Sequence, residues 1–118
     1  MTVYGINNCE TVKKVLDWLK VNKLAYNFHN FKTNGITKEK LEEWIKFIGW
    51  KNVFNLKSAT YRKLISEGQA EVNDKKSAIK MMIANTSCIK RPVIEKDGML
   101  IVGYNPLELN QLINKNKK

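Results

Sequence analysis

The sequence predicts an α/β fold with one four-stranded mixed sheet and a helical insertion. Residues 1–31 have the pattern of a strand, a helix and a strand, and residues 86–118 have that of two strands and a helix. Residues 32–85, between them, show mainly helical spacing. A length of 118 residues suits one domain. We therefore predict a single domain over 1–118, with a core of 1–31 and 86–118 and an insertion of 32–85.

The first segment is expected to be a β-α-β unit. Residues 3–6 are β-branched and aromatic, and a helix is predicted from Glu10 to about Asn22. The apolar residues of this helix recur at helical spacing: Val12, Val15, Leu16 and Leu19. In residues 24–31 apolar and polar side chains alternate, which indicates a second strand. The two strands should be parallel and joined by a right-handed crossover.

The insertion is expected to contain two capped helices. Thr37 is suited to the N-cap of the first, and Gly49 is suited to its C-terminal end. Residues 50–71 are less regular and read as helix or loop. Asp74 is suited to the N-cap of the second helix, which should end near Asn85.

The last third changes to strands and a final helix. Residues 93–95 and 99–102 are short apolar runs, and the link Lys96-Asp97-Gly98 is typical of a hairpin turn. Asn105 then suits an N-cap, Pro106 the first helical position and Glu108 the third. Two parallel strands and an antiparallel hairpin in one sheet form the thioredoxin-like arrangement, here with a central helical insertion.

Composition limits the class of protein. No apolar run reaches the roughly 20 residues of a membrane span, and no signal peptide is evident, so we expect a cytoplasmic protein. The formal charge is +10, but the lysines are scattered along the chain. We therefore expect solvated helix faces rather than a nucleic-acid surface. No long apolar stripe is evident, which favours a monomer.

Cys9 is the candidate catalytic residue. It falls where the first strand gives way to the first helix, and the free N–H groups and dipole of a helix N-terminus favour a thiolate. A thiolate is the nucleophilic form of cysteine, and the same N-terminus, with Asn8 and Thr11 beside the thiol, can hold an anion. The alternative is a small buried hydrophobic residue, but the polar neighbours Asn8 and Glu10 favour a functional thiol.

The motif has one thiol. Cys9 is followed by Glu10-Thr11-Val12, so no second cysteine lies one turn along the helix. An adduct on Cys9 must therefore be resolved by an external thiol or by the distant Cys88. For Cys88 a packed core thiol and a resolving thiol both remain open.

Arg91 and Pro92 form the second candidate constellation. The proline enters a predicted strand and can be cis, packed against the thiol loop. Arg91 would then stand near Cys9 and could bind an oxyanion through two hydrogen bonds. The alternative is an exposed basic residue before a strand-entry proline.

Three segments together resemble one known family. "YGINNCETVKK", "NLKSATYRKL" and "IKRPV" followed by "GMLIVGY" occur in the order and spacing of the arsenate reductase-like (ArsC/Spx) family, and the pattern is most similar to its YffB-type branch. The resemblance implies a thioredoxin-like fold, a reactive Cys9, a cis Pro92 and an arginine, Arg91, that faces the thiol.

The departures from the family pattern bear on activity. Arsenate reductases of this family follow their cysteine with Gly-Thr-Ser and present three arginines to the oxyanion. Here only Arg91 matches, Lys57 stands in place of a second arginine and Gly103 falls where the third would be. Arg62, in "YRKL", matches the YffB-type pattern. Lys57 and Arg62 are thus expected to bind anionic groups together with Arg91.

The resemblance implies a glutathione-linked thiol oxidoreductase, with weak arsenate reduction as an option. Glutathione or another small thiol would be the co-substrate and glutaredoxin a possible partner, and we expect no bound cofactor or metal. The alternative is a Spx-like transcriptional regulator that binds the RNA polymerase α-subunit without catalysis. Spx-type regulators often sense oxidation through C-x-x-C, which Val12 removes here.

Overall fold

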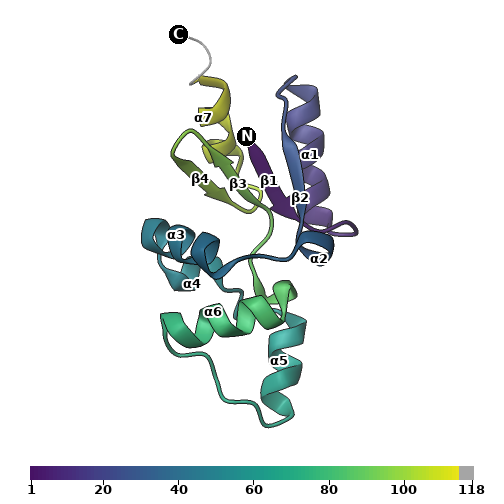
Figure 1. The fold of residues 1–118 in the computed structure, drawn as a ribbon. Helices are drawn as coiled ribbons and strands as arrows, with labels where there is room; N and C mark the ends of the chain where they lie inside the picture. The colour runs from purple at the N-terminus through teal and green to yellow at the C-terminus, as the bar shows by residue number, and fades with distance from the viewer. Residues whose placement is uncertain (115–118) are drawn as a thin grey trace. The chain divides into compact units, whose positions relative to one another are not determined.

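A computed structural model describes residues 1–114 of the chain, and these residues fall into two compact units (Figure 1). One unit contains residues 1–31 and the described residues from 91 onwards, and the other contains Lys32–Lys90. The boundary thus lies between Lys90 and Arg91, whereas the pattern of the sequence placed it at residue 86. That the chain behaves as a single domain stays a prediction.

The first unit is built on a four-stranded sheet in the order β2-β1-β3-β4. Its strands are β1 (Thr2–Gly5), β2 (Asn27–Asn30), β3 (Val93–Lys96) and β4 (Met99–Val102). β1 pairs with β2 in parallel and with β3 in antiparallel fashion, and β3 and β4 form an antiparallel hairpin. The predicted α/β fold with one mixed sheet is therefore confirmed.

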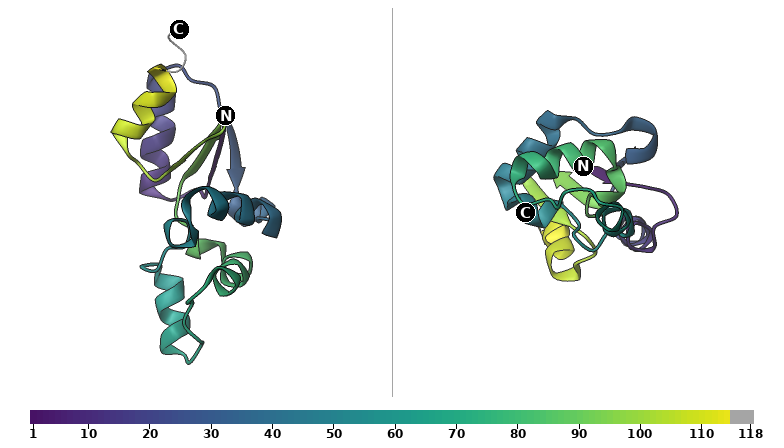
Figure 2. Two further views of the ribbon diagram at one scale, coloured as in Figure 1. Left: turned by 90° about the vertical axis from the view of Figure 1, so that its left-hand side faces the viewer. Right: turned by 90° about the horizontal axis from the view of Figure 1, so that it is seen from below.

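Two helices cover one face of this sheet. α1 (Glu10–Val21) and α7 (Pro106–Asn114) lie side by side against it in Figure 2. The core between them and the sheet contains Val3, Val15, Leu19, Ile94, Ile101, Leu109 and Leu112. Burial of each such side chain contributes roughly 1.5–3 kcal/mol relative to exposure. This core fixes the end of β1 against the start of α1, where Cys9 lies.

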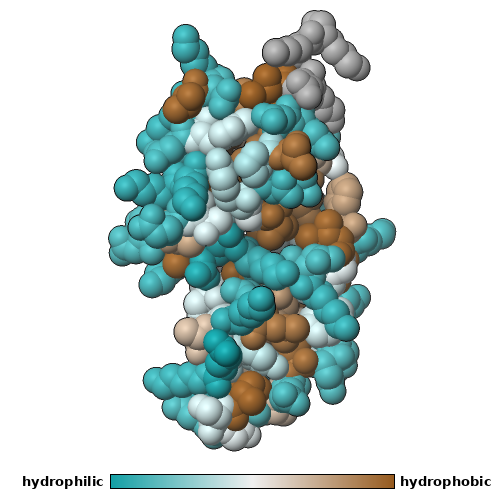
Figure 3. Space-filling view, turned by 180° about the vertical axis from the view of Figure 1, so that it is seen from behind, coloured by the Kyte–Doolittle hydropathy of each residue, from teal (hydrophilic) through white to brown (hydrophobic). Residues whose placement is uncertain are grey.

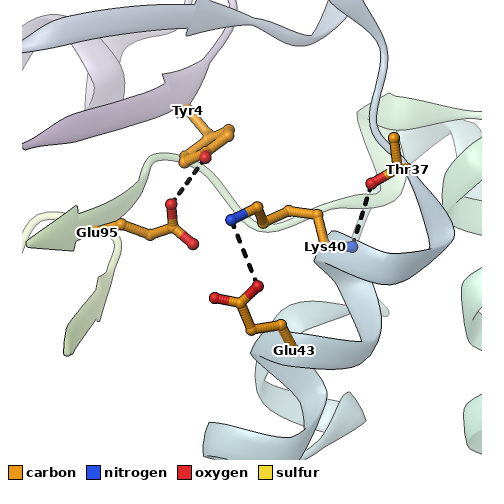
Figure 4. A network of polar contacts seen from close by, with 5 residues as sticks. All are labelled: Tyr4, Thr37, Lys40, Glu43 and Glu95. Atoms are coloured by element: carbon orange, nitrogen blue, oxygen red, sulfur yellow. Dashed lines mark hydrogen bonds and ion pairs between the residues drawn. The ribbon is translucent and has the colours of Figure 1, made fainter.

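The opposite face of the sheet carries aromatic side chains and a carboxylate. Tyr4 donates a hydrogen bond of 2.7 Å to Oε1 of Glu95 (Figure 4). The ring of His29 lies 4.8 Å from that of Tyr4 and 5.9 Å from that of Phe31, measured between centroids. Tyr4 and Phe31 are buried. His29 therefore packs in an aromatic cluster on this face.

The second strand is shorter than the alternation of its residues predicts. β2 begins at Asn27, which pairs with Thr2, the first residue of β1. Leu24 and Tyr26 precede the paired region but still pack against the core, as Phe28 does. The alternation of apolar and polar residues in 24–31 thus indicates that one side of an extended segment is buried. The hydrogen-bonded pairing of β2 with β1 extends only as far as β1 itself.

The hairpin and the last cap agree with the sequence. Asp97 and Gly98 have positive φ angles of 45° and 79°, which match a type I′ turn. At the start of α7, Oδ1 of Asn105 accepts a hydrogen bond of 3.3 Å from the N–H of Glu108. Asn105 is therefore the N-cap, as predicted.

The second unit is helical. Its elements follow the short α2 (Phe31–Asn34) and are α3 (Lys38–Ile48), α4 (Trp50–Val53), α5 (Ala59–Ser66), α6 (Lys75–Ala84) and the 3₁₀ turn η1 (Thr86–Cys88). Thr37 caps α3 by accepting from Lys40 N–H (Figure 4), and Gly49 ends it with a φ of 88°. Asp74 caps α6 and forms a reciprocal capping box with Ser77.

The core of the helical unit comes from α3, α6 and the segments beside η1. Leu41 and Trp44 of α3 and Met82 of α6 are almost fully buried, and α3 and α6 contact each other. Phe54 and Ile89 form an isolated antiparallel bridge. The N–H of Asn55 donates to the carbonyl of Cys88 at 2.7 Å, and that of Lys90 to the carbonyl of Val53 at 2.8 Å.

Polar side chains predominate on one face of the molecule (Figure 3). Figure 3 shows one face on which hydrophilic residues surround separate hydrophobic patches. Among residues 1–114, no helix combines the length and apolar character that a membrane crossing needs.

Candidate active site

The turn between β1 and α1 sets the position of the candidate nucleophile. Asn8 adopts a positive φ of 57°, and Cys9 follows in an extended conformation as the N-cap of α1. The carbonyl of Cys9 accepts the first helical hydrogen bond, from Lys13 N–H at 2.9 Å. As the N-cap residue, Cys9 has the free amides of the first helical turn in front of its side chain.

Close packing holds this turn in place. A Cβ atom added to Gly5, the last residue of β1, would lie 2.8 Å from Cγ2 of Val12 in the first turn of α1. Real Cβ atoms do not approach so closely without a shift of their neighbours. Glycine therefore allows the strand and the helix to approach at the point where the chain turns to Cys9.

The surroundings of the Cys9 sulfur favour the thiolate. Partial burial raises the pKa of the thiol, but the nearby backbone N–H of Val12 and the side chain of Arg91 lower it. The positive charge of Arg91 and the N–H of Thr11 lower it further, and the net effect is a pKa below the ordinary cysteine value. Cys9 is partly exposed. The surroundings of Cys9 thus favour its thiolate form, and the residue is partly open to solvent.

Sheet pairing brings Arg91 to the thiol. β3 runs antiparallel to β1, and Val93 pairs with Tyr4, so the residues just before β3 lie beside the end of β1. Arg91 and Pro92 occupy this position, and the peptide bond between them is cis. The N–H of Gly103 donates to the carbonyl of Pro92 at 2.8 Å, which ties the end of β4 to the same place.

A groove runs from the sulfur along α1. Its volume is about 580 Å³, and its walls are formed by the β1–α1 turn, by one face of α1 and by Phe28 of β2. Beyond Cys9, the helix contributes the charged residues Glu10, Lys13, Asp17 and Lys20 to the walls. The groove therefore offers apolar surface and charges of both signs next to a thiolate.

Sequence reasoning missed this groove, although a signal for it exists. Beyond its first turn, α1 lines the groove with positions 13, 16, 17 and 20, which together with the N-cap Cys9 have the spacing of one helix face; Glu10 and Val12 of the first turn complete the lining. In the sequence alone, charged residues on one helix face indicate exposure to solvent. They indicate a binding groove only when Cys9, at the N-terminus of the same helix, is considered together with them.

Of the anion-binding residues expected near Cys9, Arg91 contacts the sulfur directly, and Thr11 contributes its backbone N–H. Asn8 lines the groove and is exposed. Lys57 and Arg62 belong to the helical unit, and both are exposed; Lys57 N–H donates to Asn55 Oδ1 at 3.0 Å. Their roles in substrate binding stay predictions.

Cys88 has a different environment from Cys9. It lies in η1 within the helical unit, its side chain has no exposed surface, and the hydroxyl of Ser58 donates to its sulfur at 3.8 Å. This is the setting of a packed core thiol. Pairing of Cys88 with Cys9 stays a prediction.

Comparisons with known proteins agree with the fold. The ArsC family model matches residues 4–114. A solved structure of a YffB protein is 41% identical, covers 93% of this chain and 96% of its own, and superposes with a TM-score of 0.86. An uncharacterized protein of Haemophilus influenzae is 35% identical over 92% of this chain and 94% of its own length. The global transcriptional regulator Spx of Streptococcus agalactiae is 23% identical over 96% of this chain and 82% of its own length.

Proposed function

The chain belongs to the ArsC family, and from this premise we propose that it is a glutathione-linked thiol oxidoreductase with Cys9 as its single nucleophile. The observation that carries the proposal is the environment of the Cys9 sulfur: the backbone amides of Val12 and Thr11 and the side chain of Arg91 lower its pKa, and Cys9 lines a groove. These donors favour the thiolate, the form that attacks disulfides.

The reaction is thiol–disulfide exchange in two steps. The Cys9 thiolate attacks the glutathione sulfur of a mixed disulfide, forms a Cys9–glutathione disulfide and releases the substrate as a thiolate. A second glutathione thiolate then attacks the glutathione sulfur on Cys9, which yields oxidised glutathione and restores the Cys9 thiolate. Glutathione supplies both electrons, and the leaving thiolates take up protons from solvent. Because Val12 replaces the second cysteine of a C-x-x-C pair, an external thiol completes the cycle.

The groove supports glutathione as the co-substrate. Glutathione carries two carboxylates and one ammonium group, and the groove presents Lys13 and Lys20 together with the opposite charges of Glu10 and Asp17. Helix rise places Lys13 roughly 6 Å and Lys20 roughly 16 Å from Cys9 along the axis. An extended tripeptide spans roughly 10 Å, and the sulfur of glutathione is on its central residue. Glutathione with its sulfur at Cys9 can therefore reach Lys13, whereas Lys20 lies beyond its span. Lys57 and Arg62 are proposed to bind the acidic groups of the larger substrate, with Arg91.

Turnover of hydroxyethyl disulfide tests the proposal, with glutathione as the reductant and glutathione reductase as the coupling enzyme. The wild-type protein should accelerate the reaction, Cys9→Ser should abolish the acceleration, and Cys88→Ser should retain it. Mass spectrometry after exposure to oxidised glutathione should place one glutathione on Cys9. A wild-type rate equal to the uncatalysed rate, or equal rates for wild type and Cys9→Ser, would refute the proposal.

Arsenate is expected to be a poor substrate. Gly103, where the family pattern has an arginine, has a φ of 80°, a conformation that side chains other than glycine rarely adopt. Lysine at position 57 supplies charge but cannot form the paired hydrogen bonds of a guanidinium. Coupled arsenate reduction should therefore be much slower than disulfide reduction.

A second candidate function is a Spx-like transcriptional regulator that binds the RNA polymerase α-subunit. The match to Spx over nearly the whole chain supports it, and Gly49 corresponds to the glycine that this branch is expected to use for polymerase contact. Binding to the isolated α-subunit tests it, and Gly49→Arg should abolish binding. Gly68→Arg is the matched control, because Gly68 is also an exposed helix-terminal glycine with positive φ in the helical unit. Wild-type protein that does not bind, or equal loss in both variants, would refute this function.

A further inference from the structure

A second groove lies within the helical unit, between α3 and α6. Its volume is about 450 Å³, within the range of ligand-binding pockets. Ile79 and Ile83 of α6 and the aliphatic stems of lysines form its walls. Ile83 is 45% exposed, although its neighbour Ile79 is only 5% exposed. The groove is therefore an apolar surface that the helical unit leaves open to solvent.

Positive charges surround this apolar surface. The groove is lined by Lys38 of α3 and by Lys75, Lys76 and Lys80 of α6, with Glu42 as the one acidic residue among its lining residues. Within residues 1–114, none of these four lysines belongs to an ion pair. Residues 32–90 as a whole contain twelve basic and six acidic residues, so the surroundings of the groove are also basic.

Helix stability does not account for the lysines at the start of α6. Lys75 and Lys76 occupy its first turn, where the helix dipole favours acidic residues and disfavours cations. Hydrogen bonds from Ser77 and the charge of Lys76 lower the pKa of Asp74, so the N-cap carboxylate offsets part of the charge of Lys76. The groove thus has four lysines against the carboxylate of Glu42 and the neighbouring carboxylate of Asp74, and this leaves a net positive rim.

The groove combines an apolar surface, formed by Ile79 and Ile83, with surrounding lysines, and this combination favours a ligand that is both apolar and acidic. We propose that the groove between α3 and α6 binds an acidic, amphipathic peptide segment of a partner protein, whose apolar side chains contact Ile79 and Ile83 while its carboxylates face the lysines. Nucleic acid is the less suitable ligand, because the lining residues include no aromatic side chain on which a base could stack. The proposal concerns the helical unit alone and does not depend on the reactivity of Cys9.

Fluorescence anisotropy with a labelled peptide tests the proposal on the full chain. The probe is a peptide of about twelve residues, LLEELLEELLEE, which has the length of an amphipathic helix in a groove. The reference probes are LLKKLLKKLLKK, SSEESSEESSEE and a single-stranded oligo-dT of the same length. The acidic amphipathic peptide should bind at least roughly tenfold more tightly than each reference probe, which corresponds to about 1.4 kcal/mol.

Two variants locate the binding site. The double variant Lys75→Glu, Lys80→Glu and the single variant Ile83→Ser should each weaken peptide binding at least roughly tenfold. The double variant Lys46→Glu, Lys63→Glu is the matched control, because it changes the net charge equally at exposed lysines that do not line the groove. Circular dichroism verifies that each variant is folded, and amide chemical shifts should move on α3 and α6 when the peptide is added.

The outcomes separate the alternatives. Equal weakening by the groove variants and by the charge-matched control would show nonspecific attraction and overturn the proposal. Tighter binding of oligo-dT than of the acidic peptide, lost in the groove double variant, would overturn it in favour of a nucleic-acid surface. Absence of peptide binding to the wild-type protein would also overturn it.

Discussion

The side chain of Arg91 donates a hydrogen bond to the sulfur of Cys9, from the opposite end of the sequence. The two residues meet because β3 pairs with β1, so that the residue before β3 reaches the turn that follows β1. Both belong to the sheet-containing unit. The arrangement couples the charge state of the thiol to the position of a single guanidinium.

Removal of this guanidinium should slow the reactions of Cys9. In Arg91→Leu the thiol loses a charged hydrogen-bond donor and a nearby positive charge, so its pKa should rise. The rate of alkylation by iodoacetamide near neutral pH should fall roughly three- to tenfold, an estimate reduced for the partial exposure of the site. Absorbance of the thiolate at about 240 nm, followed against pH, measures the change in pKa.

Arg91→Lys is the matched variant for this prediction. It keeps the positive charge but not the planar donor group, so its alkylation rate should lie between those of the wild type and Arg91→Leu. Equal rates in all three proteins would show that Arg91 does not influence the thiol.

The thiol should also make stability depend on pH. Its pKa is lower in the folded protein than the value of about 8.5 expected after unfolding. Between these two values the unfolded chain binds more protons, so stability rises with pH in that window. The contribution is lost as pH falls through the folded-state pKa. The free energy of unfolding of the wild type minus that of Cys9→Ser should therefore increase as the pH rises from the folded-state pKa of Cys9 to about 8.5.

Urea denaturation with a reductant present measures this difference, and subtraction removes groups that titrate alike in both proteins. A difference that stays constant or decreases with pH would contradict the lowered pKa of Cys9.

The close approach of Gly5 and Val12 predicts a paired effect of substitutions. Gly5→Ala places a Cβ 2.8 Å from Cγ2 of Val12 and should destabilise the protein by about 1–3 kcal/mol. Val12→Ala alone should also destabilise it, because Val12 is buried. In the double variant the clash is relieved, so its destabilisation should be smaller than the sum of the two single effects. Chemical denaturation of all four proteins completes the cycle, and strict additivity would argue against the contact.

The two cysteines should differ in accessibility. Cys9 is partly exposed and Cys88 is fully buried, so Ellman's reagent should react rapidly with one thiol per folded chain and with both thiols in urea. In Cys9→Ser the rapid phase should disappear, whereas in Cys88→Ser it should remain. Rapid reaction of both thiols in the folded protein would contradict the burial of Cys88.

Local chemistry in the sequence predicted much of the fold. Thr37, Asp74 and Asn105 were identifiable as N-caps because their short polar side chains satisfy free amides. The Asp97-Gly98 turn was identifiable because few residue pairs adopt two positive φ angles. These signals depend on neighbouring residues alone, which is why a single sequence contains them.

The remaining features depend on contacts between distant residues. The start of β2 is set by the length of β1, so the alternation of residues 24–31 could not define it. Phe31 continues that alternation but begins the short helix α2 and is buried beside Tyr4. The capping box of α6 uses Ser77 in place of the more common Glu or Gln, which obscured its signal.

In the candidate site, too, some features follow from neighbouring residues and others depend on contacts between distant ones. The N-cap position of Cys9 and the amides around it follow from the local pattern. Arg91 lies near the thiol because β1 pairs with β3. The sequence indicated this pairing only through the predicted topology and the family resemblance. The groove along α1 combines side chains of a helix with Phe28 of β2, and packing between elements is not encoded in any one segment.

The boundary between the two units, between Lys90 and Arg91, has a consequence for how the sequence can change. The sulfur and its guanidinium both lie in the unit with the sheet, so mutations in residues 32–90 can remodel surface charge without altering the reacting pair. Sequence change in the helical unit can therefore leave the environment of the thiol in the other unit intact.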